Sequence, residues 1–166
     1  MEKTKLPFFG KVSIDKSLVE QDYQTYVRID NWLVEFNLIF ETENLEISDL
    51  QSLTPFLHKF NEHLNYIRLA ILHEYNSNDD IKRFIKTNIE ALTQLGKEVL
   101  QDTLAKDMTL ENYFLQELEL ARVYFFPDDD NEFVKLIFQI SEDFTDEILF
   151  VRLGTDFKIK EISTEY

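Results

Sequence analysis

The chain has 166 residues, of which 44% are apolar and 30% charged, a composition typical of a folded globular protein. The absence of cysteine excludes disulfides, thiolate metal sites and cysteine nucleophiles. A net charge of −15 argues against binding to nucleic-acid phosphates or to an anionic membrane. No apolar run approaches the ~18 residues that a membrane span requires. We therefore expect one domain over residues 1–166, with neither nucleic acid nor membrane as a partner.

The start of the chain differs from a secretion signal. Residues 1–5 are polar, and the apolar run that follows at 6–9 is shorter than the ~7–15 residues of a signal peptide. We therefore expect a cytoplasmic protein. Residues 11–15 then alternate between apolar and polar side chains, which predicts a first strand.

A β-hairpin is predicted around the pair Asp30-Asn31. Both residue types tolerate positive φ angles, and strand patterns flank them at 26–29 and 32–40. In the second strand the more polar face carries Leu33, Glu35, Asn37, Ile39 and Glu41. The opposite face is apolar and consists of Trp32, Val34, Phe36, Leu38 and Phe40. This alternation predicts a half-buried strand.

The middle of the chain has the periodicity of helices. Ser48 and Gln51 are spaced as a capping box, and Pro55 suits the first position of a helix over 54–75. Apolar residues recur there at spacings of three and four, at Phe56, Phe60, Leu64, Ile67, Ile71 and Tyr75. Residues 76–78 break the pattern, and Asp79 begins a second helix that ends near Gly96.

Two further helical pieces are predicted before the chain returns to strands. The first lies around residues 99–104, and Thr109 begins the second. Strand patterns then occur at 118–125, 133–140, 148–153 and 157–162, joined by short polar turns as in an antiparallel meander. Strands, then helices, then strands predict an α+β fold, in which a central helical segment packs on one face of an antiparallel sheet. The expected core includes Trp32, Phe36, Phe60, Ile67, Phe84, Ile85, Leu136 and Phe138.

Metal binding is not expected from the sequence. His58, His63 and His73 are spaced by five and ten residues, whereas ligands on one helix face need three or four. The acidic run at 128–131 resembles the start of a calcium loop, but the required glycine and glutamate positions fall on Phe133 and Gln139. We expect ordinary histidines at helix surfaces or boundaries, and a solvated turn.

Catalytic and cofactor motifs are also missing from the sequence. With three glycines in the whole chain, no glycine-rich phosphate loop is present, and neither is a Gly-x-Ser-x-Gly elbow. We therefore expect no catalytic, cofactor or metal residues and a non-enzymatic protein.

The acidic charge is concentrated towards the C-terminus. Residues 107–166 hold 15 acidic and 5 basic side chains, a net charge of −10, against 17 acidic and 12 basic in residues 1–106. A negative surface of this kind steers the approach of a basic protein. The predicted partner-binding face consists of Asp128, Asp129, Asp130, Glu132, Asp143, Asp146 and Glu147.

Other interpretations of the same residues stay open. The acidic excess could simply be polar cover for the outer face of the sheet. The protein could instead be an enzyme or small-ligand binder with a site between sheet and helices, or a structural or oligomeric module. Trp32, Tyr124 and Tyr166 are alternative aromatic anchors for an interface.

One resemblance is carried by the opening segment Leu-Pro-Phe-Phe-Gly-Lys-Val-Ser-Ile-Asp at 6–15, followed by the strand at 34–40, a helical middle and an acidic β-rich end. In these features the chain resembles a family of small acidic bacterial proteins, a domain of unknown function similar to the immunity proteins that accompany polymorphic toxins. The resemblance implies a bacterial cytoplasmic protein without catalytic residues. It also allows a toxin-neutralising immunity role, in which the acidic face would cover the basic active site of a toxin.

Overall fold

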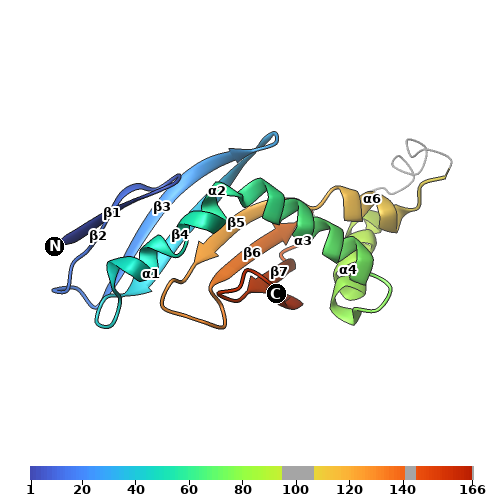
Figure 1. Cartoon of the computed structure of the whole chain (residues 1–166). Helices are drawn as coiled ribbons and strands as arrows, with labels where there is room; N and C mark the ends of the chain where they lie inside the picture. The colour runs from blue at the N-terminus through green and yellow to red at the C-terminus, as the bar shows by residue number, and fades with distance from the viewer. Residues whose placement is uncertain (95–106, 141–144, 166) are drawn as a thin grey trace.

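The computed structural model, which describes residues 1–94, 107–140 and 145–165, has an α+β fold built on a six-stranded sheet (Figure 1). The order of strands in this sheet is β3-β4-β5-β6-β7-β8. Their bounds are β3 Glu20–Ile29, β4 Trp32–Glu41, β5 Glu119–Phe125, β6 Val134–Gln139, β7 Ile148–Leu153 and β8 Ile159–Glu165. A separate hairpin at the N-terminus consists of β1 (Glu2–Leu6) and β2 (Gly10–Ile14). The predicted combination of N-terminal strands, helical middle and C-terminal meander is thus confirmed.

The helices that the structure describes connect the two groups of strands. They are α1 (Ile47–Gln51), α2 (Thr54–His58), α3 (Phe60–Glu74), α4 (Asp79–Gln94) and α6 (Leu110–Gln116). In Figure 1, α1, α2 and α3 follow one another across a single face of the sheet. No helix in the described ranges has the length and apolar character needed to cross a membrane.

Strand pairing is antiparallel except between β4 and β5. These two strands run parallel, with Leu38 opposite Phe125, and they join the N-terminal hairpin to the C-terminal meander. A parallel pair needs a long crossover connection, and here the helical middle of the chain supplies it. The carboxyl ends of β4 and β5 consequently lie side by side.

Phenylalanines fill the space between the sheet and the helices. Phe36 on β4 is fully buried, and its ring lies 4.9 Å from Phe60 on α3 and 5.5 Å from Phe125 on β5. Seven of the eight predicted core residues are buried. The exception is Trp32, which is 49% exposed. It is the first residue after the turn of the β3–β4 hairpin. Because the tip of this hairpin extends beyond the core, the Trp32 side chain is only partly covered.

The helix boundaries differ from the predicted ones at two places. Glu46 caps α1 and forms the capping box with Asp49, two residues before the predicted box. The helix predicted over 54–75 is divided at Lys59, whose φ of −107° and ψ of 24° leave the helical region. The backbone bond from His63 N to Lys59 O bridges the division, so the apolar stripe continues through it.

The remaining differences concern strand ends. β3 begins at Glu20, six residues before the predicted start, and β8 extends to Glu165. The polar opening residues form β1, which the sequence pattern did not indicate. The start of a helix at Thr109 is confirmed, because its side chain accepts a hydrogen bond from Asn112 N as the cap of α6. The predicted helix end near Gly96 and the piece at 99–104 lie outside the described residues.

Candidate functional site

The parallel pair β4–β5 brings several acidic side chains together at one end of the sheet. Because the two carboxyl ends lie together, Glu41 at the end of β4 meets Asp128 in the loop after β5. The Asp128 carboxylate accepts a hydrogen bond from the Glu41 backbone N–H at 2.8 Å, across 87 residues of sequence. This bond fastens the β5–β6 loop to the end of β4.

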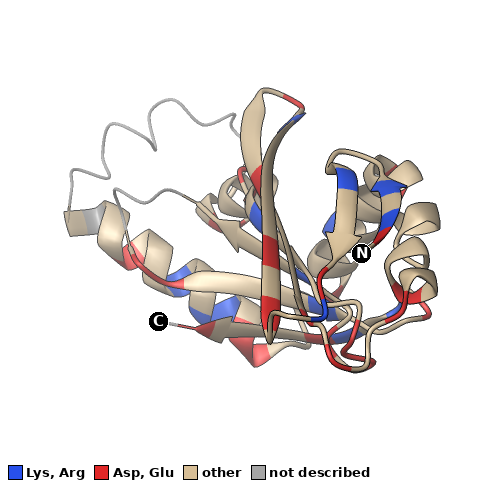
Figure 2. Ribbon diagram, turned by 90° about the vertical axis from the view of Figure 1, so that its left-hand side faces the viewer, with Lys and Arg blue, Asp and Glu red and all other residues tan. Residues whose placement is uncertain are grey.

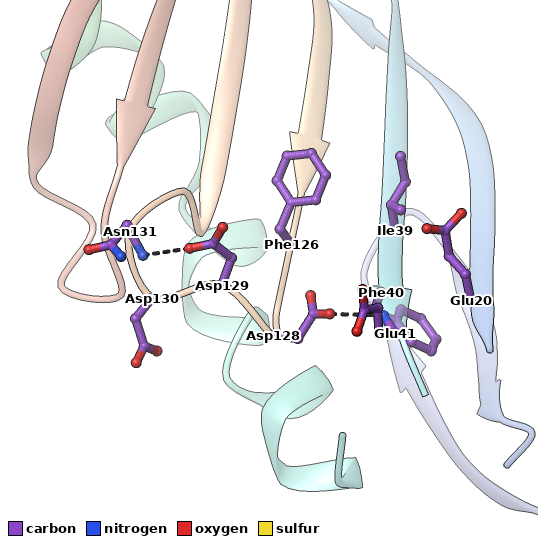
Figure 3. Close-up of a pocket in the computed structure, with 9 residues that line it drawn as sticks. All are labelled: Glu20, Ile39, Phe40, Glu41, Phe126, Asp128, Asp129, Asp130 and Asn131. Atoms are coloured by element: carbon purple, nitrogen blue, oxygen red, sulfur yellow. Dashed lines mark hydrogen bonds between the residues drawn. The ribbon is translucent and has the colours of Figure 1, made fainter. Parts of the chain in front are cut away.

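A surface hollow of about 550 Å³ opens beside this bond. Its apolar floor is made by Ile39 and Phe126, which Figure 3 shows between the carboxylates of Glu20 and Asp129. The Phe126 ring is itself fixed by stacking on Tyr124, with centroids 6.1 Å apart. The residues that line the hollow are Glu20, Ile39, Phe40, Glu41, Phe126, Asp128, Asp129, Asp130 and Asn131.

A second hollow, of about 280 Å³, adjoins the first and shares three acidic residues with it. It adds Asp49 from α1 and the loop residues Asn44 and Leu45. In the part of the chain that the structure describes, neither lining includes a lysine or an arginine. We call the carboxylates of the two hollows the acidic end; they belong to Glu20, Glu41, Asp49, Asp128, Asp129 and Asp130.

Three of these carboxylates hold the local backbone in place. Asp129 accepts hydrogen bonds from the N–H groups of Asn131 and Glu132, at 2.8 and 3.0 Å, and so shapes the turn. Asp49 accepts from the Glu46 N–H at 2.7 Å, and Asp128 accepts from Glu41 as described.

The other three carboxylates of the acidic end do not hold the backbone in this way. Within the described ranges, the side chains of Glu20, Glu41 and Asp130 have no hydrogen-bond or ion-pair partner, and all three residues are exposed. Figure 2 shows acidic segments in the loops along the lower side of the molecule in that view. These three carboxylates are therefore available to a cation that approaches from outside.

Within the described residues, the nearby Lys16 forms no ion pair with the carboxylates of the acidic end. Its ammonium donates to the backbone carbonyls of Thr42, Glu43 and Leu45, at 2.7, 3.2 and 2.6 Å. An ammonium has three donors, so this lysine is fully used in holding the loop after β4. It stiffens one wall of the site and, although it keeps its positive charge, has no N–H left to donate to the carboxylates.

The structure brings together only part of the predicted acidic face. Asp128, Asp129 and Asp130 share the β5–β6 loop, and Glu132 close to them is in an ion pair with Arg152 at 2.8 Å. The other predicted residues precede β7, at the opposite end of β6, which at ~3.3 Å per residue is roughly 20 Å long. Of these, Asp146 is exposed and Asp143 lies outside the described residues.

Glu147 is not part of a surface. It is 2% exposed, and the nearest cation is the Arg83 guanidinium of α4, whose Nε lies 3.7 Å from the carboxylate. A buried carboxylate beside an arginine ties α4 to the start of β7 and does not face a partner.

Sequence patterns missed half of the acidic end. Glu20, Glu41 and Asp49 lie far from the β5–β6 loop in sequence, and no local motif joins them to it. The alternation of β4 predicted only that Glu41 lies on the more polar face of the strand, and it did not indicate which residues Glu41 meets. The parallel pairing that assembles the site is a tertiary contact.

Among the histidines, His63 has an altered environment. Its ring stacks on Phe56 with centroids 4.5 Å apart, and Phe157 contacts it edge-on. Burial lowers the pKa of His63, an effect that nearby Glu62 opposes and Lys59 reinforces. Within the described residues, no three histidine or carboxylate side chains converge in a way that could hold a metal ion.

Comparison with known proteins gives no relative: no family model matches the chain, and neither a curated protein nor a solved structure is significantly similar to it.

Proposed function

We propose that this chain is a non-enzymatic protein-binding domain whose acidic end receives a basic side chain of a partner protein. The observation that supports the proposal is the hollow in which exposed carboxylates surround an apolar floor, with no lysine or arginine among its described lining residues. Lysine and arginine have long apolar stems and cationic heads. The apolar floor suits the stem, and the surrounding carboxylates suit the cationic head. The Phe126 ring adds a face to which a cation is attracted.

The specific form of the proposal is a toxin-neutralising immunity protein of the bacterial cytoplasm. It rests on the resemblance of the opening segment and on the chemistry of the acidic end. Enzymes that act on nucleic acids or other anionic substrates have basic active sites. Carboxylates held on a stiff loop could occupy such a site in place of the substrate and block it.

The alternative, an enzyme or small-ligand site between the sheet and the helices, has less support. The space there is occupied by packed aromatic rings, with Phe56 and Phe60 on the helices in contact with Phe36 and Phe125 on the sheet. A ligand would have to displace this core.

The test is a charge reversal that spares the structural carboxylates. The double variant Glu41→Lys plus Asp130→Lys changes two side chains without partners and leaves the hydrogen bonds of Asp128 and Asp129 intact. Its matched control is Glu62→Lys plus Glu117→Lys, the same change in net charge at exposed positions away from the acidic end.

The measurement is capture of partners from a lysate of the source cell, followed by association kinetics at two salt concentrations. The double variant should lower the on-rate roughly tenfold at low salt, and the control should not, because steering acts through the local field. The wild-type on-rate should also fall as salt rises. Equal binding by wild type and double variant would refute the role of the acidic end.

A further inference from the structure

The two edges of the six-stranded sheet differ in how they are protected. The edge strand β8 is covered by the start of α4, where Asn78 donates to the Ile162 carbonyl at 3.3 Å and Ser163 donates to Asp80 at 2.7 Å. Within the described residues, the other edge strand, β3, has backbone pairing with β4 alone, since β1 and β2 form a separate sheet. Ser13 and Asp15 contact β3 through the side chains of Tyr23 and Gln21 and leave its outer backbone groups unpaired. A bare strand edge offers a row of unpaired N–H and C=O groups to another strand.

The register of β3 shows which of its backbone groups point outward. The Val19 carbonyl accepts a hydrogen bond from Thr42 N at 2.9 Å, so residue 19 directs its backbone groups toward β4. Because these directions alternate along a strand, the even-numbered residues direct theirs to the free edge. The five such residues are all exposed: Glu20, Asp22, Gln24, Tyr26 and Arg28.

Three of the usual protections of a strand edge, a bulge, a proline and a lysine, are missing from β3. Its ten residues pair with β4 in unbroken register from Glu20 opposite Glu41 to Ile29 opposite Trp32, without a bulge. The strand contains neither proline nor lysine, the residues that commonly discourage edge pairing. In Figure 2 β3 is the tall strand that faces the viewer, and the β1–β2 hairpin stands to one side of it.

We propose that the free edge of β3 pairs with β3 of a second copy of this chain, antiparallel and centred on Gln24. In this register every hydrogen-bonded pair joins two outward-directed residues. Gln24 faces Gln24 of the second copy, and Asp22 faces Tyr26. Glu20 faces Arg28 at both ends, and the two sheets become one.

The distribution of charge along β3 favours a second copy of this chain as the strand that pairs with its free edge. β3 is acidic where it begins, at Glu20 and Asp22, and basic near the hairpin, at Arg28. An antiparallel pairing about a two-fold axis sets each acidic end against a basic end, and opposite charges on facing strands stabilise the pair. The net charge of −15 opposes association at long range, but salt screens it beyond ~8 Å at physiological ionic strength.

The test is sedimentation equilibrium at an ionic strength of about 0.15 M, over a series of protein concentrations. Wild-type protein should reach about twice the monomer mass of 19.9 kDa. Glu20→Arg or Arg28→Glu alone should each raise the dimer dissociation constant roughly tenfold, because each creates two like-charge pairs per dimer. An equimolar mixture of the two variants should restore dimers, because every reversed charge then faces its opposite.

Two further variants complete the test. Glu117→Arg makes the same charge reversal at an exposed position at the end of α6, away from β3, and should leave dimerisation unchanged. Gln24→Pro removes an outward N–H at the centre of the pairing and should give a folded monomer, with the fold checked by circular dichroism. A monomeric wild type at all concentrations would overturn the inference, as would a dimer that is indifferent to Arg28→Glu and Gln24→Pro. Arg28→Glu and Gln24→Pro lie outside the acidic end, so their effect on self-association is independent of whether the acidic end binds a partner.

Discussion

The packing of Phe36 gives the most direct test of how this fold is stabilised. The side chain is fully buried on the inner face of β4, and its ring contacts two rings from the N-terminal turn, Phe8 and Phe9, besides Phe60 and Phe125. Phe36→Ala therefore removes apolar burial and leaves a cavity where three parts of the chain meet. Such truncations cost about 3–5 kcal/mol. The aromatic contacts place this one towards the upper end of that range.

The measurement is equilibrium unfolding in urea, monitored by circular dichroism. With a urea dependence of about 2 kcal/mol per M, a loss of about 4 kcal/mol lowers the unfolding midpoint by roughly 2 M. Trp32→Ala is a matched control, because Trp32 is larger, lies on the same strand and the same face, and is 49% exposed. Its cost should stay below about 1 kcal/mol. Equal midpoints for the two variants would refute the assignment of the core.

Two further predictions concern pH and helix capping. Because burial holds the pKa of His63 below 6.5, the unfolded chain binds more protons as the pH falls through 6.5, and stability should decrease until the pH is below the folded-state pKa. The His63→Gln variant should lack this part of the pH dependence in urea unfolding curves recorded between about pH 7.5 and 5.5, and identical slopes for both proteins would contradict it. Thr109→Ala removes the side chain that caps α6 and should destabilise the protein by about 0.5–2 kcal/mol, whereas Thr109→Ser, which keeps the hydroxyl, should be nearly neutral in thermal unfolding.

The sequence by itself determined the features that depend on neighbours along the chain. The alternation through Val34, Phe36 and Leu38 identified the buried face of β4, because successive side chains of a strand point to opposite faces. The apolar spacing in α3 identified its buried stripe for the corresponding reason. Thr109 was predicted to begin a helix, since capping involves only the next few residues.

Only the tertiary structure decided which distant segments meet. The parallel pairing of β4 with β5 sets Glu41 beside Asp128, and neither strand's own pattern encodes its neighbour. Burial of Glu147 beside Arg83, and exposure of Trp32 at a hairpin tip, likewise depend on where whole elements pack. A period in the sequence specifies which face of an element is apolar, whereas the partner of that face is chosen by the packing of the entire chain. The acidic end, assembled from three separate segments, therefore became visible only in the folded molecule.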